Sequence, residues 1–564
     1  MVDRFKKIFS SQQTSVLSAA TLIMLMVIAS RVLGLVRQRA LAHFFTADQL
    51  SLFFAAFRLP DLIFEVLVFG AFSSAFIPVF TGLLKKGKKE AWQVAASIVN
   101  LGILAFLVVS AVLVFFSPHL YGVLAPGFTN GQQETIVSLT RVLFIAQGFF
   151  IVSYVLTAVL ESSRRFLVPA IAPLFYNLGI IAGTYLLSPT FGLMAPVIGV
   201  IVGASLHFLI QLPLSMKLGF KFLPKIVIDA NVKKIGHLAL PRLIEVSVTQ
   251  VSKTVELFLS SLISTASFTY FTLGSAIYLL PVGLFGTSLA KAALPTLARQ
   301  RDDRIQFKKT LYAALYQMIF LILPISTALI VLRIPVVRLI FGTDIFSWEA
   351  TVQTGLVVSA FSFGVIFQAA NSLLSRSFYA LQDTKTPVMV SITSIFFNIA
   401  LAFVFIKVLG LPTWGLAAAF SIGSFIQAVV LFILINKRLE SGSMLSLLTP
   451  VFKSIFASII SGGVMFLTLK FFDRWFWIKR ASTNLPFEKF VLDTRYTWNL
   501  LALTVIVIFV GIMVYFGVLL LLKSKELWYF MDLLKRIFVT KMVGPVPQKE
   551  SETVSPTPGD SNPS

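Results

Sequence analysis

Long runs of apolar residues recur along the whole chain and constrain its fold more than any other feature. Several approach the roughly 20 residues that a helix needs to cross about 30 Å of hydrocarbon. Only 13% of the residues are charged and 57% are hydrophobic, so a soluble domain with a polar surface is excluded. The backbone of a spanning segment must satisfy its own hydrogen bonds, which requires helices. The longest runs are Val16–Gly34, Val99–Phe116, Ile136–Leu160, Met318–Val331, Val388–Ile406, Leu411–Ile435 and Leu500–Leu522.

These runs predict an all-α polytopic membrane protein with about fourteen transmembrane helices. The remainder after residue 523 begins as a basic amphipathic stretch and ends in a tail too polar to form a core. The predicted spans cover residues 15–42, 50–81, 92–116, 134–161, 169–187, 193–216, 236–262, 269–297, 307–332, 349–375, 386–408, 411–437, 449–472 and 497–522.

The net charge of +23 is placed mainly in alternate loops. Nucleic-acid binding would be one reason for such a charge, but the alternation is the positive-inside pattern, which places both termini in the cytoplasm. The stretch 472–498 is an exception, because it is basic on the outer side, and its aromatic residues suggest a segment along the outer interface. The basic loops carry Lys85, Lys86, Lys88, Lys89, Arg164, Arg165, Arg299, Arg301, Arg304, Lys308, Lys309, Lys437 and Arg438.

A weak internal repeat divides the chain. Pro78 and Pro295 lie in similar sextets before a basic loop, and Asn177 and Asn398 each follow two aromatic residues at nearly the same spacing. Two six-helix lobes in one orientation imply a pseudo-twofold axis along the membrane normal, although chance similarity among apolar segments is the alternative. The predicted divisions are 1–220 (N-lobe, spans 1–6), 221–440 (C-lobe, spans 7–12), 441–523 (spans 13–14) and 524–564 (basic stretch and cytoplasmic tail).

The first predicted span contains a cluster of arginines, which are costly in a membrane unless they face protein or water. Ser30 and Arg31 precede Gly34, and Arg37 and Arg39 follow it. Six residues separate the first two arginines, so an ideal helix would not align them; a bend or close packing at Gly34 would bring both toward one cavity. Arginine suits phosphate, because its planar fork donates paired hydrogen bonds. The alternative is snorkelling to the interface, above all for Arg37 and Arg39.

The seventh predicted span contains the second polar cluster. Its members at positions 245, 249, 252 and 256 follow one helical stripe, which is typical of a cavity wall; a structural seam between packed helices is the alternative. Lys253 is within reach of Glu256 or Glu245, and Lys291 of span eight would add a cation to the same space. The polar residues of this cluster are Arg242, Glu245, Thr249, Gln250, Ser252, Lys253 and Glu256.

Several classes of chemistry lack the residues they need. The chain has no cysteine, and its four histidines are scattered without ligand spacing. It contains neither a phosphate-binding loop nor a zinc-protease motif, and no nucleophile stands beside a plausible base. We therefore expect a transporter and not an enzyme, with no cofactor, no metal and no nucleic-acid partner.

At these positions the chain resembles the MurJ/MviN lipid II flippases. The similarity runs in order from about residue 20 to 440, and its most distinctive parts are the opening segment and the loop before Pro387. The segments that carry it are Ser30–Arg37, Phe57–Leu62, Gly70–Phe80, Ala125–Phe128, Leu240–Arg242 and Arg376–Pro387.

The resemblance implies a fold like that of the multidrug/oligosaccharidyl-lipid/polysaccharide exporter superfamily, with a cationic cavity between two lobes. It implies transport of lipid II, the undecaprenyl-diphosphate-linked peptidoglycan precursor, to the outer leaflet of the cytoplasmic membrane by alternating access. Arg31, Arg37 and Ser30 would lie at the diphosphate, with Arg39 and Arg58 nearby in the same signature. The two extra spans would form a groove for the lipid tail. Membrane lipids and proteins of cell-wall synthesis would be its partners.

The chain departs from the family pattern at several charged positions. Acidic residues are expected where Gln38 and Ser51 stand, and an arginine is expected in span eight where Ala276 stands. Charged residues are also common where Phe64 and Phe69 stand. Lys253 or Lys291 would compensate for the missing arginine. These departures leave open an exporter of another polyprenyl-diphosphate-linked glycan, a drug/ion antiporter of the same fold, or a non-transporting membrane scaffold.

Overall fold

The computed structural model describes residues 16–66, 76–222, 226–439, 445–479, 491–524 and 527–528. In this part of the chain the regular structure is helical, and the β contact is an isolated parallel bridge between Asp473 and Leu492. Each of the fourteen predicted segments overlaps a helix or a series of short helices. Among the described residues, 11 helices are long and apolar enough to cross a membrane. The amphipathic stretch and tail predicted after residue 524 lie outside the described residues, apart from Leu527 and Trp528.

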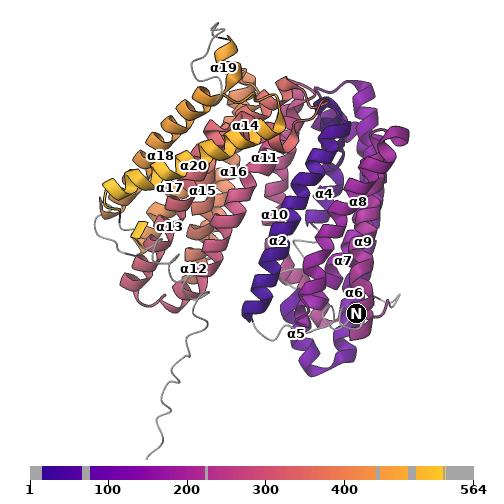
Figure 1. Ribbon diagram of the computed structural model, residues 1–564. Helices are drawn as coiled ribbons and strands as arrows, with labels where there is room; N and C mark the ends of the chain where they lie inside the picture. Colours follow the sequence, from indigo (N-terminus) through magenta and orange to yellow (C-terminus); the bar gives the residue numbers. More distant parts are fainter. Residues whose placement is uncertain are drawn as a thin grey trace, which may run out of the picture.

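The helices form two bundles, which we call the N lobe and the C lobe, and a C-terminal pair lies outside the C lobe (Figure 1). The N lobe contains α2 (Val16–Phe44), α3 (Ala47–Ala56), α4 (Arg58–Phe64), α5 (Ile77–Lys86), α6 (Lys88–Leu124), α7 (Asn130–Ser162), α8 (Leu167–Phe191) and α9 (Met194–Leu218). The C lobe contains α10 (Ala230–Ile263), α11 (Ser267–Pro281), the π-helix η3 (Val282–Thr287), α12 (Ser288–Arg299), α13 (Arg304–Val331), α14 (Arg333–Phe341), α15 (Trp348–Ala380), α16 (Lys385–Phe403), the π-helix η4 (Val404–Val408) and α17 (Trp414–Arg438). The C-terminal segment contains α18 (Leu445–Phe472), the short α19 (Arg474–Lys479) and α20 (Thr497–Leu521).

The two lobes repeat one packing scheme. In the N lobe α9 packs on α8 and α7, and α2 packs on α8. The corresponding helices of the C lobe make the same contacts: α17 packs on α16 and α15, and α10 packs on α16. The predicted pseudo-twofold arrangement of two six-helix lobes is thereby confirmed. The additional helices α18 and α20 pack on each other, and α18 also packs on α13.

Small residues set the closest helix contact in the N lobe. Gly179 and Gly183 of α8 face Gly203 and Gly199 of α9, and a Cβ atom on any of the four would overlap the backbone of the other helix. In a membrane, where lipid tails are as apolar as leucine, such small-residue pairs let backbones approach and dispersion forces act. This packing holds α8 in place, and α8 supports α2 with its arginines.

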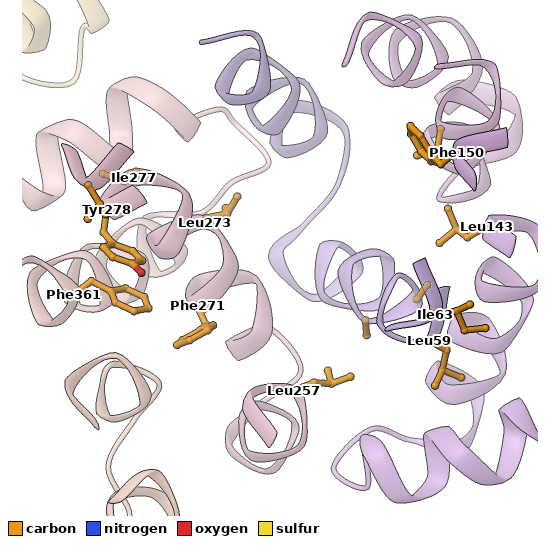
Figure 2. Close-up of a cluster of buried hydrophobic side chains, with 14 of the residues drawn as sticks. Leu59, Ile63, Leu143, Phe150, Leu257, Phe271, Leu273, Ile277, Tyr278 and Phe361 are labelled. Atoms are coloured by element: carbon orange, nitrogen blue, oxygen red, sulfur yellow. The ribbon is translucent and has the colours of Figure 1, made fainter. Parts of the chain in front are cut away.

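Large apolar side chains fill the inside of each lobe. In the C lobe, Tyr278 stacks on Phe361 with ring centroids 4.5 Å apart. Figure 2 shows these two residues beside Phe271, whereas Leu59 and Phe150 lie among the N-lobe helices on the other side of the view. Large apolar side chains are also exposed on the outer helix faces, as expected for surfaces that contact lipid.

Three predicted spans are not single α-helices, and two helices, α14 and α19, lie outside the predicted spans. The segment 386–408 ends in the π-helix η4. The segment 50–81 contains α3, α4 and α5, with residues 67–75 outside the described part. The segment 269–297 is interrupted by the π-helix η3, a distortion that often occurs at functional sites. Helix α14 falls between two predicted spans, because its nine residues are too few to cross a membrane and include two arginines.

The lobes contact each other at both ends of the molecule. We call the end with the basic loops of Lys89, Arg164 and Arg301 the basic end, and the other the opposite end. At the opposite end, buried Ser51 of α3 contacts Thr269 of α11, with 2.9 Å between the hydroxyl oxygens. At the basic end, the linker before α10 is tied to the N lobe by the backbone N–H of Val227, which donates to Ser97.

Candidate functional site

A cavity of about 340 Å³ lies between the lobes, and we call it the inter-lobe cavity. Most of its wall comes from the N lobe, and α11 of the C lobe supplies the rest. Its charged and polar lining includes Arg37, Arg58, Asp61 and Gln38, while aromatic rings cover much of the remaining wall. The other lining residues are Leu41, Phe53, Phe54, Phe57, Tyr176, Ile180, Phe268 and Thr272.

The polar groups of this cavity are positioned by partners on neighbouring helices. Asp61 accepts a hydrogen bond from Nε2 of Gln147 on α7, at 3.0 Å. Arg58 is 8% exposed, and its guanidinium donates to Oε1 of Gln250 on α10. Within the described part of the chain, Nε of Arg58 and Oε1 of Gln38 are buried without a hydrogen-bond partner. Two guanidinium groups beside one carboxylate, with the Nε donor of Arg58 still unpaired, fit an anionic polar ligand.

A second polar contact joins the lobes next to this cavity. Nζ of Lys253 on α10 lies 2.8 Å and 3.0 Å from the two carboxylate oxygens of Glu65, directly after α4. Nε2 of Gln250 also donates to Glu65. Lys253 therefore pairs with an acid of the N lobe and not with Glu256, one of its two predicted partners, while the side chain of the other, Glu245, lies outside the described part. Glu65 keeps a right-handed helical backbone at the end of α4, and its partner is 188 residues away.

Arg31 and Arg37 do not face one cavity. Helix α2 continues without interruption through Gly34, so the six-residue spacing places the two arginines on different faces and about 9 Å apart along the axis. Arg31 and Ser30 line a separate cavity of about 250 Å³, together with Glu161 at the end of α7 and the first turns of α8. We call it the side cavity.

Arg39 lines neither cavity. Its Nη1 donates to the carbonyl oxygens of Leu339 at 2.8 Å and of Ile340 at 3.2 Å, near the C-terminal end of α14. Cations commonly satisfy the free carbonyls at a helix C-terminus. The side chain therefore ties α2 to the C lobe at the opposite end, a contact that the sequence pattern did not predict.

The stripe on α10 divides between two environments. Ser252 and Glu256 face a small space inside the C lobe, which Asn398 of α16 also lines, and the hydroxyl of Ser252 lies 3.4 Å from Oε1 of Glu256. Lys253, one residue further along the helix, turns toward the N lobe. The side chains of Arg242 and Glu245 lie outside the described part, and Lys291 is exposed on α12 and lines neither cavity.

The sequence pattern did not select two acids of the site, Asp61 and Glu65. It included Gln250 but did not predict that this residue bridges the two lobes. The criterion that selected Lys253 would have found the two acids, because an ionisable residue inside an apolar segment is costly without a partner. The contacts of Gln250 with Arg58 and Glu65, and of Lys253 with Glu65, could not be predicted, because these partners are 185 to 192 residues apart in the chain.

Hydrogen bonds between neutral groups close the opposite end. The hydroxyl of Thr269 donates to the carbonyl of Ala47 at 2.6 Å, and its backbone N–H donates to Ser51 at 2.9 Å. Nearby, the backbone N–H of Gly127 donates to the hydroxyl of Ser261 at 3.3 Å. The inter-lobe cavity is therefore separated from the opposite end by direct contacts between α3 and α11 and between the loop after α6 and α10.

Solved structures share this arrangement. The structure "Lipid II flippase MurJ, inward closed conformation" matches with a TM-score of 0.72 and 25% sequence identity, covering 92% of this chain and 100% of that chain. An inward-facing multidrug resistance MATE family transporter matches with a TM-score of 0.61 at 14% identity, covering 73% of this chain and 94% of that one. The second likeness shows the common fold alone.

Sequence relatives point the same way. The chain is 30% identical over 434 residues to a probable lipid II flippase MurJ of Vibrio cholerae, covering 74% of this chain and 82% of the relative. It is 29% identical over 464 residues to that of Buchnera aphidicola, covering 79% and 88%. The profile of the family described as "Lipid II flippase MurJ" matches residues 40–484. With most of its length matched in sequence and in fold, the chain belongs to the MurJ family of lipid II flippases.

Proposed function

We propose that this chain moves lipid II, the undecaprenyl-diphosphate-linked peptidoglycan precursor, from the inner to the outer leaflet of the cytoplasmic membrane. The observation that carries the proposal is the inter-lobe cavity with Arg37 and Arg58 in its wall. Without help, the charged headgroup would have to give up its hydration to pass hydrocarbon, which is prohibitive. Guanidinium groups replace that hydration with paired hydrogen bonds to phosphate oxygens. No covalent bond changes, so the activity is transport.

The basic end faces the cytoplasm in this proposal. Loops rich in lysine and arginine remain on the cytoplasmic side of a membrane, and this rule also places both termini there. The hydrogen bonds at the opposite end then close the outer side, so the conformation described here is the one that receives a headgroup from the inner leaflet. An inside-negative potential favours outward movement of the dianionic headgroup.

The arginines take different parts in this scheme. Arg37 and Arg58 line the inter-lobe cavity and would bind the diphosphate. Arg31 and Ser30 line the side cavity, nearer the basic end, and would meet the headgroup on its way in. Arg39 would hold the lobes together through α14. Arg242 and Glu245 are proposed as further contacts for the headgroup on the sequence pattern of α10 alone, whereas Glu256 faces the small space inside the C lobe.

Helices α18 and α20 offer a place for the long lipid tail. They pack on the outside of the C lobe and expose large apolar side chains, among them Phe452 and Phe466 of α18 and Phe509 of α20. A polyprenyl chain can lie against such a surface while its headgroup occupies the cavity. Peptidoglycan synthesis on the outer side consumes the delivered precursor, so proteins of cell-wall synthesis are the expected partners.

Complementation tests this function. Cells depleted of their own lipid II flippase would express the wild type, Arg37→Ala, Arg58→Ala or Arg301→Ala, with membrane levels compared for all four. We expect the wild type and Arg301→Ala to restore growth, because Arg301 lies in an exposed loop, and the two cavity variants to fail. Failure of the well-expressed wild type would contradict lipid II as the substrate, and growth with both cavity variants would contradict the site.

A further inference from the structure

The ion pair between Lys253 and Glu65 has a special position in the molecule. Of the four ion pairs between described residues, it alone joins the two lobes, since the others link residues within one lobe or one loop. Its side chains are 40% and 27% exposed, so neither is sealed in the protein interior. A partly exposed pair of this kind contributes little to stability and is easily exchanged.

A chain of hydrogen bonds connects this pair to the inter-lobe cavity. Arg58, in the cavity wall, donates to Oε1 of Gln250, and Nε2 of the same amide donates to Glu65. An anion held by Arg58 is therefore separated from the Glu65 carboxylate by one amide group. Two negative charges at such a separation repel, while Lys253 attracts both. The ammonium of lysine sits on a flexible stem and can turn from one anion to another.

We propose that Glu65 is a resident counter-ion of Lys253 that the diphosphate of the substrate displaces, and that this exchange releases a latch between the lobes. The inference rests on the proposed function, because it requires an anionic headgroup in the inter-lobe cavity. Before binding, Glu65 occupies Lys253 and holds α10 against the N lobe. After binding, the phosphates take Lys253 as a third cation beside Arg37 and Arg58.

This exchange gives the substrate a different affinity for the two conformational states, which alternating access requires. A ligand shifts a conformational equilibrium only by its difference in affinity for the two states. While the latch is closed, Lys253 is neutralised, and the diphosphate gains two cations. When the latch is open, the same ligand gains a third. The substrate therefore binds the unlatched state more tightly and draws the lobes apart at the opposite end.

The exchange and a merely structural salt bridge predict different effects of the two substitutions on diphosphate binding. Replacing Glu65 by glutamine breaks the latch but frees Lys253, so a diphosphate should bind more tightly. Replacing Lys253 by glutamine breaks the same latch and removes a cation, so a diphosphate should bind more weakly. A structural pair would make both substitutions act in the same direction, because each removes the same ion pair.

The test uses the full chain in lipid nanodiscs, with undecaprenyl diphosphate as the probe and undecaprenol as its uncharged counterpart. The chain has no cysteine, so spin labels at Thr190→Cys and Asp344→Cys, both exposed at the opposite end of the two lobes, report the separation of the lobes by electron–electron resonance. The variants are Glu65→Gln and Lys253→Gln. Glu349→Gln and Lys407→Gln serve as controls, because both residues are exposed and neither is in an ion pair of the described residues.

Without ligand, we expect both latch variants to populate longer distances than the wild type and both controls to match it. For undecaprenyl diphosphate, we expect Lys253→Gln to weaken binding about 10-fold and Glu65→Gln to tighten it about threefold, which is the size of effect expected when one charge-assisted hydrogen bond is removed or made available. Undecaprenol should not lengthen the wild-type distance, whereas the diphosphate should. Unchanged ligand-free distances in both variants, or equal weakening of binding in both, would overturn the exchange. The double variant Glu65→Lys and Lys253→Glu, in which the two charges are exchanged, should restore the short distance. That result would also show that substitutions at both positions are tolerated.

Undecaprenyl diphosphate lacks the sugar-peptide headgroup, so this test does not depend on the identity of the glycan. Opposite effects of the two variants without any lipid II transport by the wild type would contradict the proposed function and support the exchange. Transport of lipid II by the wild type, together with equal effects of the two variants, would support the proposed function and contradict the exchange.

Discussion

The hydroxyl oxygens of Ser51 and Thr269 lie 2.9 Å apart across the boundary between the two lobes, and both residues are buried. At this contact the chain closes its opposite end through neutral groups. Each such hydrogen bond contributes only about 0.5–1.5 kcal/mol net. A few of them can hold the lobes together and still break within a transport cycle.

Substituting Thr269 by valine should open this end. The change removes the hydroxyl–hydroxyl contact with Ser51 and the bond donated to the carbonyl of Ala47, and it leaves buried groups unpaired, at a cost of about 1–3 kcal/mol. Spin labels at Thr190→Cys and Asp344→Cys should report longer distances. Thr393→Val is the control, because its hydroxyl bonds only to Met389 on its own helix in the described structure. Equal distances in Thr269→Val and the control would show that the hydroxyl contact does not hold the lobes.

Adding one methyl group at Gly127 should prevent closure. A Cβ atom there would overlap the carbonyl oxygen of Ser261 in the C lobe, and backbone cannot yield as a flexible side chain would. Gly127→Ala should therefore favour the state that is open at the opposite end and lower the transport rate. Gly131→Ala is the matched control, since a Cβ there meets nothing within 4 Å. Transport by Gly127→Ala at the rate of its control would contradict the closed contact.

The glycine contact between α8 and α9 should also not tolerate an added methyl group. Gly199→Ala places a methyl group against the backbone of α8, and overpacking of this kind costs about 1–3 kcal/mol. Gly517→Ala, on α20 with open space around it, should have little effect. The apparent melting temperature of the detergent-solubilised protein measures the difference. If Gly199→Ala has the same apparent melting temperature as the wild type, the two helices can move apart without loss of stability, which would contradict this prediction.

The loop between α15 and α16 should confer stability that depends on pH. Partial burial raises the pKa of Asp383, but hydrogen bonds from Thr386 and Arg438 lower it by more, so the pKa lies below its ordinary value of 3.8. The charged form is thus favoured by folding, and its contribution is complete above the ordinary pKa and is lost as the pH falls through the folded pKa.

Asp383→Asn should therefore lower the apparent melting temperature at pH 7 by roughly 2–4 °C, and the difference should shrink toward pH 3. Asp302→Asn is the control, because its ion pair with Arg301 is exposed and contributes little. A difference between Asp383→Asn and wild type that stays constant down to pH 3 would exclude the carboxylate as its source.

Sequence reasoning predicted the helices from apolar length and the two lobes from the internal repeat, because both signals can be read within the sequence itself. It did not predict that Lys253 pairs with Glu65, since the two residues are 188 positions apart in the chain and only tertiary packing brings them together. Arg31 and Arg37 were expected to share a cavity, but α2 keeps its regular twist through Gly34. Whether a glycine such as Gly127 faces open space or another backbone is also decided by tertiary packing alone.

The most direct test of lipid II transport is the movement of fluorescent lipid II between the leaflets of proteoliposomes that contain the full chain. We expect protein-dependent translocation by the wild type and by Arg301→Ala. We expect an initial rate about 10- to 100-fold lower for Arg37→Ala, because this variant cannot donate a charge-assisted hydrogen bond to the diphosphate. Translocation no faster than in protein-free liposomes would contradict lipid II transport by this chain, and an Arg37→Ala rate equal to that of the wild type would contradict the role of the inter-lobe cavity.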